Sequence, residues 1–168
     1  SLLKLEEQGK TAMILAVNGK PAGIVAAMDT PKENAVEAIQ KLKRMGLQVA
    51  MLTGDNERTA NAIAKQLGIG QVIANVLPWE KVDVIKKLQS QGKTVAMVGD
   101  GVNDAPALKK ANIGVSVGNA TDVAQETASL ILLDSDFKTL VNAVEEGRVI
   151  FENMKKVVAY VLSNSFAE

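Results

Sequence analysis

Short apolar runs rich in Val, Ile and Ala alternate with segments of helical period along most of the chain. Strands that are apolar throughout are typical of a parallel sheet whose two faces are both covered by helices. The pattern therefore predicts an α/β fold of Rossmann-like type, with a mostly parallel sheet and helices on both faces. The predicted strands are residues 11–17, 22–28, 48–52, 71–74, 94–98, 113–117 and 130–133, and the predicted helices are residues 33–45, 57–67, 79–91, 103–110 and 122–127.

The two ends of the chain depart from this alternation. Asn18-Gly19 joins the first two predicted strands, and Asn-Gly is the strongest short signal for an antiparallel β-hairpin. From residue 136 onward a long, charge-rich helical pattern predicts a connecting helix. Its apolar stretch, residues 157–162, is too short to cross a bilayer. We expect an N-terminal hairpin, a long C-terminal helix and a soluble chain.

The amino-acid composition limits which kinds of catalytic and metal site the chain can form. The 168 residues fit one globular domain, and 19 basic residues balance 19 acidic ones, so we expect no nucleic-acid partner. The chain has no cysteine and no histidine, which excludes disulfide frameworks, Cys or His metal clusters and imidazole catalysis. It also lacks a signal-peptide pattern at its start, which fits a cytosolic setting. Any catalysis must use carboxylates, lysines, hydroxyls and the backbone.

The segment 98–106, Val-Gly-Asp-Gly-Val-Asn-Asp-Ala-Pro, carries the clearest chemical signal. It follows a predicted buried strand, so Asp100 lies at the carboxyl edge of the sheet, where open α/β sheets bind ligands. Asn103 and Asp104 open the next helix, whose free N–H groups attract anions. Two carboxylates so close together favour a bound divalent cation, and oxygen ligands favour Mg²⁺. The alternative is a plain strand-to-helix turn in which Asp104 only caps the helix.

A second predicted strand, residues 48–52, ends in Thr53-Gly54-Asp55 and places a hydroxyl and a carboxylate at the same edge. These residues predict a phosphate- or nucleotide-binding loop. The alternative is that Asp55, or Asn56 after it, is an ordinary N-cap of the following helix.

Lys81 lies in the first turn of a predicted helix, three residues after Pro78. A cation in this position opposes the helix dipole unless it faces an anion. The alternative is a solvated surface lysine.

Residues 53–55 and 98–108 resemble two hallmark segments of the P-type ATPases, which are members of the haloacid dehalogenase superfamily. Their order and spacing also match, and segments 29–32 and 76–78 extend the resemblance over nearly the whole chain. The first hundred residues look most like heavy-metal pumps such as copper exporters. The last part, from residue 145, is similar to the helix that leads toward a transmembrane span in calcium-pump-type members.

The resemblance implies roles for these side chains. Asp100 would bind the catalytic Mg²⁺, with Asp104 and Asn103 holding the surroundings of metal and phosphate. Thr53 would bind the phosphoryl group with Gly54, Lys81 would offset its charge, and Asp55 would face the nucleotide region. Mg²⁺ is the implied cofactor and ATP the substrate of the parent enzyme. Positioning and charge neutralisation of this kind are what phosphoryl transfer requires.

The resemblance also implies an organisation and partners. Residues 1–20 would end a nucleotide-binding domain, residues 21–145 would form the phosphorylation domain, and residues 146–168 would be a stalk helix. The partners would be the nucleotide-binding, actuator and transmembrane domains of a pump, and the transported cation a heavy metal such as copper, or calcium. In the parent protein the chain would lie on the cytoplasmic face of a membrane.

One hallmark of the family is missing. The phosphorylated aspartate lies in an Asp-Lys-Thr-Gly-Thr segment, and that string does not occur here. The same resemblance places that segment at the end of the central strand, so the sheet would lack a strand between two neighbours and expose their edges. Either that strand comes from another chain or segment, or the fold closes differently around the Asn18-Gly19 hairpin. Two alternatives remain open: a stand-alone phosphatase that uses Asp29 as nucleophile, and a non-catalytic module that binds nucleotide or Mg²⁺.

Overall fold

The computed structural model describes residues 2–28, 31–32, 34–134 and 136–165, with side chains up to residue 159. Its elements follow the predicted alternation of strands and helices. In chain order they are α1 (Leu2–Glu6), β1 (Thr11–Val17), β2 (Lys20–Ala27), α2 (Ala35–Arg44), β3 (Ala50–Leu52), α3 (Glu57–Leu67), β4 (Gln71–Ile73), η1 (Pro78–Glu80), α4 (Lys81–Ser90), β5 (Ala96–Gly99), η2 (Val102–Asp104), α5 (Ala105–Lys110), β6 (Ile113–Ser116), α6 (Asp122–Thr127), β7 (Leu130–Ile131) and α7 (Phe137–Ser165).

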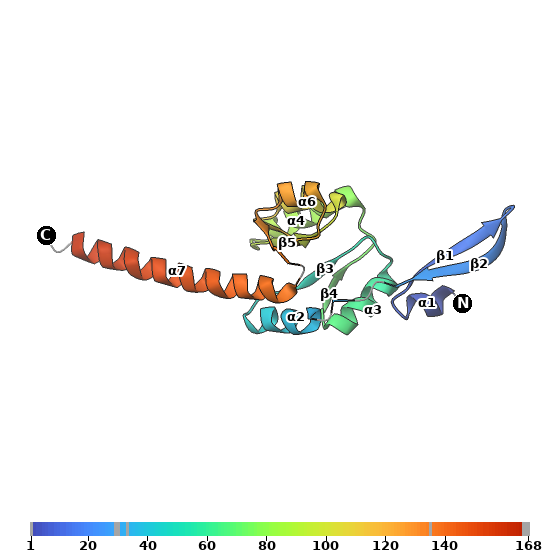
Figure 1. The fold of residues 1–168 in the computed structure, drawn as a ribbon, viewed down its shortest axis with the longest axis horizontal. Helices are drawn as coiled ribbons and strands as arrows, with labels where there is room; N and C mark the ends of the chain where they lie inside the picture. The colour runs from blue at the N-terminus through green and yellow to red at the C-terminus, as the bar shows by residue number, and fades with distance from the viewer. Residues whose placement is uncertain (1, 29–30, 33, 135, 166–168) are drawn as a thin grey trace.

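The predicted N-terminal hairpin is confirmed. β1 and β2 pair antiparallel and extend away from the body of the molecule (Figure 1). Asn18 and Gly19 have φ values of 51° and 74°, the left-handed conformation that a two-residue hairpin turn requires. The preceding α1 was not predicted, because a single turn of helix has no periodic pattern of its own.

The remaining strands are parallel, as predicted, but they form two sheets. β3 pairs with β4, and β5, β6 and β7 form a second sheet in that order. β3 and β5 share no ladder hydrogen bonds among the described residues. The break lies between the two strands that directly precede Thr53 and Asp100, where we expect a strand to be missing.

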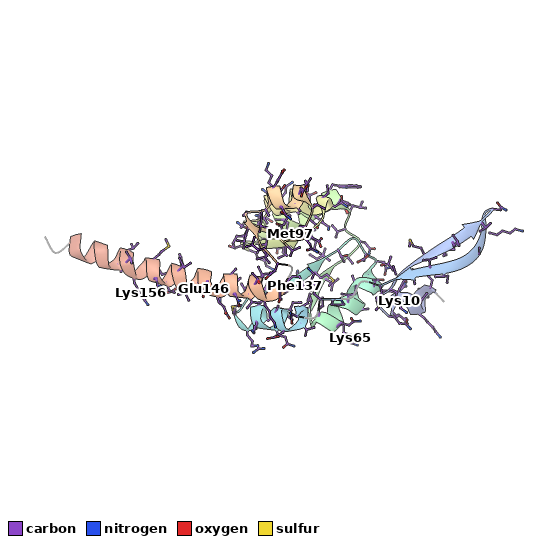
Figure 2. The ribbon with its side chains drawn as sticks, viewed as in Figure 1. Lys10, Lys65, Met97, Phe137, Glu146 and Lys156 are labelled. Atoms are coloured by element: carbon purple, nitrogen blue, oxygen red, sulfur yellow. The ribbon has the colours of Figure 1, made fainter. Side chains whose placement is uncertain are left out.

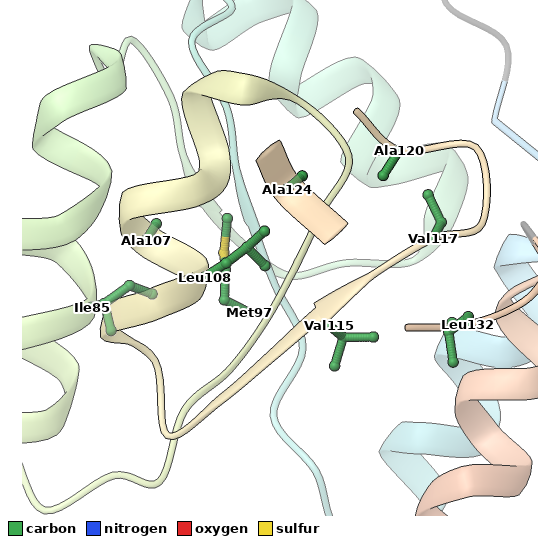
Figure 3. Close-up of a cluster of buried hydrophobic side chains, with 9 residues drawn as sticks. All are labelled: Ile85, Met97, Ala107, Leu108, Val115, Val117, Ala120, Ala124 and Leu132. Atoms are coloured by element: carbon green, nitrogen blue, oxygen red, sulfur yellow. The ribbon is translucent and has the colours of Figure 1, made fainter. Parts of the chain in front are cut away.

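The main core lies around β5 and β6. Met97 and Leu108 meet on the face covered by α5, whereas Val115 points to the opposite face, toward Leu132 (Figure 3). Leu52 of β3 packs against this cluster from the first sheet. The core therefore joins the two sheets through side chains rather than through backbone pairing.

A second cluster connects α2, α3 and the start of α7. Ile39 and Leu67 are buried there, and Met51 and Phe137 pack against them. Beyond this anchor α7 continues as one long helix, from which Glu146 and Lys156 project into solvent (Figure 2). No helix within the described ranges is long and apolar enough to span a membrane.

The expected domain limits fall inside continuous elements. The limit at residues 20 and 21 lies at the start of β2, and the limit at residues 145 and 146 lies within α7.

Candidate functional site

Lys81 and Asp104 form a close ion pair. Lys81 is the first residue of α4, and Asp104 ends η2, directly before α5. The Lys81 Nζ lies 2.7 Å from the Asp104 Oδ1, and the two side chains are only 15% and 13% exposed. The backbone N–H of Gly101 donates to the other oxygen, Oδ2, at 3.2 Å. Both carboxylate oxygens of Asp104 are therefore occupied, and Lys81 is not a solvated surface lysine.

Gly99 makes room for this carboxylate. A Cβ at position 99 would lie 2.7 Å from the Cβ and 2.9 Å from the Cγ of Asp104, much closer than such atoms pack. Only glycine at position 99 lets the Asp104 side chain lie against the end of β5.

Asp100 and Asn103 face solvent beside this pair. Both side chains are exposed and make no hydrogen bond or ion pair within the described part of the chain. The backbone of Asp100 is fixed nonetheless, because its carbonyl accepts from the Thr121 N–H at 2.9 Å. The structure thus presents a free carboxylate and a free amide on an anchored loop.

The side chains of this loop could supply some, but not all, of the ligands of a bound Mg²⁺. A carboxylate oxygen is the ligand type that Mg²⁺ prefers, and Asp100 offers one without breaking another contact. Asp104 is already engaged by Lys81 and Gly101. No group of three or more acidic, His or Cys side chains gathers anywhere in the described residues. The other ligands of a bound Mg²⁺ would come from water, a phosphoryl group or another segment.

The Thr53 loop forms a second, separate group. The Thr53 hydroxyl donates to Asp55 Oδ2 at 2.9 Å and accepts from the Asp55 N–H at 3.1 Å. Backbone bonds from Asn75 to the Asp55 carbonyl and from Val76 to the Thr53 carbonyl hold the loop against the end of β4. The N-cap of α3 is Asn56, whose side chain accepts from the Thr59 N–H. Asp55 is therefore free of the capping role that was its alternative.

The N-terminal elements reach this loop, which the sequence did not indicate. The Thr11 hydroxyl contacts Asp55 Oδ1 at 3.5 Å. The nearly buried Glu6 forms an ion pair with Arg58 at 3.1 Å and accepts from the Asn56 side chain at 3.5 Å. Sequence reasoning missed Glu6 because these partners lie about fifty positions away in the chain and no local pattern marks them.

The predicted residues thus occupy two groups. One holds Lys81, Asp104 and the loop from Gly99 to Asn103, and the other holds Thr53, Gly54 and Asp55. No hydrogen bond or ion pair joins the two groups within the residues the structure covers. Asp29 lies outside the described residues.

Two family models match the chain. Both are described as haloacid dehalogenase-like hydrolase, and they match residues 2–112 and residues 81–144. The first model alone covers more than half of the chain and includes every predicted site residue.

Individual relatives give a narrower likeness. The chain is 49% identical over 166 residues to copper-exporting P-type ATPases of Staphylococcus aureus strains JH9 and Newman, a match that covers 99% of this chain. The chain spans about a fifth of the length of these relatives, 21%.

Solved structures of ATPases also resemble this chain in sequence and fold. A zinc-transporting PIB-type ATPase in its E2.Pi state matches at 42% identity and a TM-score of 0.78, over 91% of this chain and 25% of that one. The catalytic domain of the CPx-ATPase CopB-B matches at 36% identity and a TM-score of 0.67, over 77% and 52%. The names of these relatives refer to copper and zinc, and they do not support the expected likeness to calcium pumps. The chain belongs to the haloacid dehalogenase-like hydrolases, and its sequence and fold match the corresponding domain of heavy-metal P-type ATPases.

Proposed function

We propose that the chain is the phosphorylation-domain portion of an ATP-driven pump for heavy-metal cations. In this role it binds Mg²⁺ and the phosphoryl group while an aspartyl phosphate forms and is hydrolysed. The observation that carries the proposal is the Lys81–Asp104 pair at the carboxyl end of β5, with the exposed Asp100 beside it. The identity to copper-exporting ATPases over nearly the whole chain supports the same function.

Asp100 is the proposed ligand of Mg²⁺. Its carboxylate is exposed and unpaired, on a loop whose backbone is held by Thr121. When bound, Mg²⁺ would neutralise negative charge on the phosphoryl oxygens. Asn103, on the same loop, would donate its side-chain N–H to those oxygens, and Asp104 would hold the surroundings of metal and phosphate together with Lys81.

Lys81 and Thr53 are the proposed contacts of the phosphoryl group. Asp104 holds the Lys81 ammonium while the site is empty, and Lys81 would turn to the phosphoryl group and offset its charge when that group arrives. The Thr53 hydroxyl would turn from Asp55 to the phosphoryl group and donate to it from the other sheet, together with the backbone N–H of Gly54. Asp55 would face the nucleotide, since its second oxygen already contacts Thr11 of the N-terminal elements.

The acceptor aspartate is proposed to come from another segment. The break between β3 and β5 leaves two parallel strands with edges that have no backbone partner among the described residues. Such edges favour the addition of a strand. A strand inserted there and ending in Asp would deliver its carboxylate between Thr53 and Asp100.

The remaining parts of the proposal follow from this role. Residues 1–20 would close a nucleotide-binding domain, residues 21–145 would form the phosphorylation domain, and residues 146–168 would lead toward the membrane. The partners would be the nucleotide-binding, actuator and transmembrane domains, with ATP as substrate and this domain on the cytoplasmic face. A phosphatase that uses Asp29 is less favoured, because the likeness extends over the whole chain to transporting ATPases.

Titration with MgCl₂, followed by NMR of the backbone amides, tests the metal site. We expect saturable shifts at residues 99–104, and an affinity that falls at least about tenfold in Asp100→Asn, because one charged ligand is lost. Asp83→Asn is the matched control, since Asp83 is exposed and pairs only with Lys86. Equal Mg²⁺ affinity in the wild type and Asp100→Asn would refute the assignment.

A further inference from the structure

The hydroxyl of Ser116 is buried without a partner. Ser116 is fully buried, and its Oγ is the one buried side-chain polar atom in the described part of the chain that makes no hydrogen bond. A buried hydroxyl without a partner destabilises the fold, so such groups are rare and call for an explanation. An unused donor at this position suggests that its partner forms in another state of the site.

Register and alternation place Ser116 beside Asp104. In the β5–β6 ladder Ser116 lies opposite Gly99. A Cβ on Gly114 would lie 2.5 Å from the Leu108 carbonyl oxygen, so residues 114 and 116 both face α5. Val115 points to the opposite face (Figure 3). The Asp104 side chain covers Gly99 on the α5 face as well, so Ser116 and Asp104 are neighbours on one side of the sheet.

Asp104 would need a second hydrogen-bond donor for its carboxylate whenever Lys81 leaves it. Its carboxylate is 13% exposed and has two donors, the Lys81 ammonium and the Gly101 N–H. Under the proposed function, Lys81 contacts the phosphoryl group when it arrives. Asp104 Oδ1 then loses its charged donor in a site that water reaches poorly, which is costly for a carboxylate.

We propose that Ser116 is a positioning residue for Asp104: its hydroxyl donates to the carboxylate when Lys81 turns to the phosphoryl group. This inference rests on the proposed function for Lys81. Ser116 keeps the Asp104 carboxylate in place, so that Lys81 can return after the phosphoryl group leaves. No bond is made or broken in this step, since one hydrogen bond replaces another.

A double-mutant cycle tests the inference without a ligand. Lys81→Met removes the charged donor permanently, so Ser116 should donate to Asp104 in the resting protein. Ser116→Ala should then lower the folding equilibrium constant, measured by urea unfolding, by about tenfold in the Lys81→Met background. In the wild-type background it should leave this constant unchanged or raise it. If Lys81→Met does not fold, Lys81→Leu, which also carries no donor, provides the same comparison.

Two further variants separate a specific role from a packing effect. Ser90→Ala removes an exposed hydroxyl on α4, bonded only to the Lys87 carbonyl, and should have equal effects in both backgrounds. Ser116→Thr keeps the hydroxyl and should preserve stability in the Lys81→Met background better than Ser116→Ala. Equal effects of Ser116→Ala in both backgrounds would overturn the inference, while Mg²⁺ binding at Asp100 would still support the proposed function.

Discussion

Asp104 is the most constrained side chain of the candidate site. Lys81 and Gly101 hold its two oxygens, and the bare backbone of Gly99 lies under its Cβ. A charge-assisted hydrogen bond in such a sheltered place contributes about 1.5–3 kcal/mol. An exposed pair such as Lys41–Glu37 contributes about 1 kcal/mol or less. Asp104 therefore links the ends of two elements, α4 and β5, through one carboxylate.

Gly99→Ala should disrupt this arrangement. The added methyl would overlap the Asp104 side chain, which must then shift away from Lys81. We expect a loss of about 1–3 kcal/mol in the free energy of unfolding, measured with urea, and a Lys81 side chain with altered NMR shifts. Gly101→Ala is the matched control, because its Cβ would come no closer than 3.5 Å to Asp104 and its φ of −96° suits alanine. If the two variants are equally stable, the steric role of Gly99 is wrong.

Among single residues, the sequence predicted well the positions whose chemistry is local. Asp100 was expected at the end of a buried strand; the structure has it directly after β5, in which only Met97 is buried. The sequence could not show that Asp104 pairs with Lys81, because the two residues are 23 positions apart and meet only when α4 packs beside α5. The sequence also could not show that the missing side chain of Gly99 makes room for the Asp104 side chain.

The contact of α1 with α3 is the feature at the scale of elements that connects the N-terminal hairpin to the site. Glu6 pairs with Arg58, and the Thr59 hydroxyl donates to the Lys10 carbonyl at 3.1 Å. The Thr11 contact to Asp55 lies next to these bonds in the chain. A movement of the hairpin would therefore displace Thr11 and change its contact with Asp55 in the Thr53–Asp55 loop.

Glu6→Ala should loosen this attachment. Arg58 is 58% exposed and would be solvated after the change, so we expect a moderate cost of about 1 kcal/mol rather than the larger cost of a stranded buried charge. Hydrogen exchange should become faster at the amides of residues 3–11, and the Asp55 amide should shift. Glu7→Ala is the control, because Glu7 is exposed and forms no ion pair in the described residues. Identical exchange in both variants would show that Glu6 does not hold α1.

The elements themselves were largely predictable, and their exceptions have physical causes. Long helices and apolar strands were found from period and length, within a few residues of their ends. The short α1 was missed because its five residues form hardly more than one turn. Two separate sheets were not predicted as such, since β3 and β5 each read as an ordinary buried strand.

At the scale of the whole molecule, the unpaired edges and exposed apolar surfaces share one explanation. Both faces of the hairpin carry exposed apolar side chains, including Ile14 and Val25, and α7 exposes Ile150 and Met154 far from the core. Proteins rarely leave such surfaces uncovered. Together with the break between β3 and β5, they favour a chain that works within a larger assembly, as the proposed pump requires.

The central claim is that β3 and β5 receive a strand that carries the acceptor aspartate. The most direct measurement is hydrogen exchange of the chain mixed with a peptide of apolar strand residues ending in Asp-Lys-Thr-Gly-Thr. The account predicts slower exchange at amides within both residues 50–52 and residues 96–99, at the same peptide concentration, with a peptide of scrambled sequence as control. Unchanged exchange at both edges with saturating peptide, or protection of only one, would contradict it.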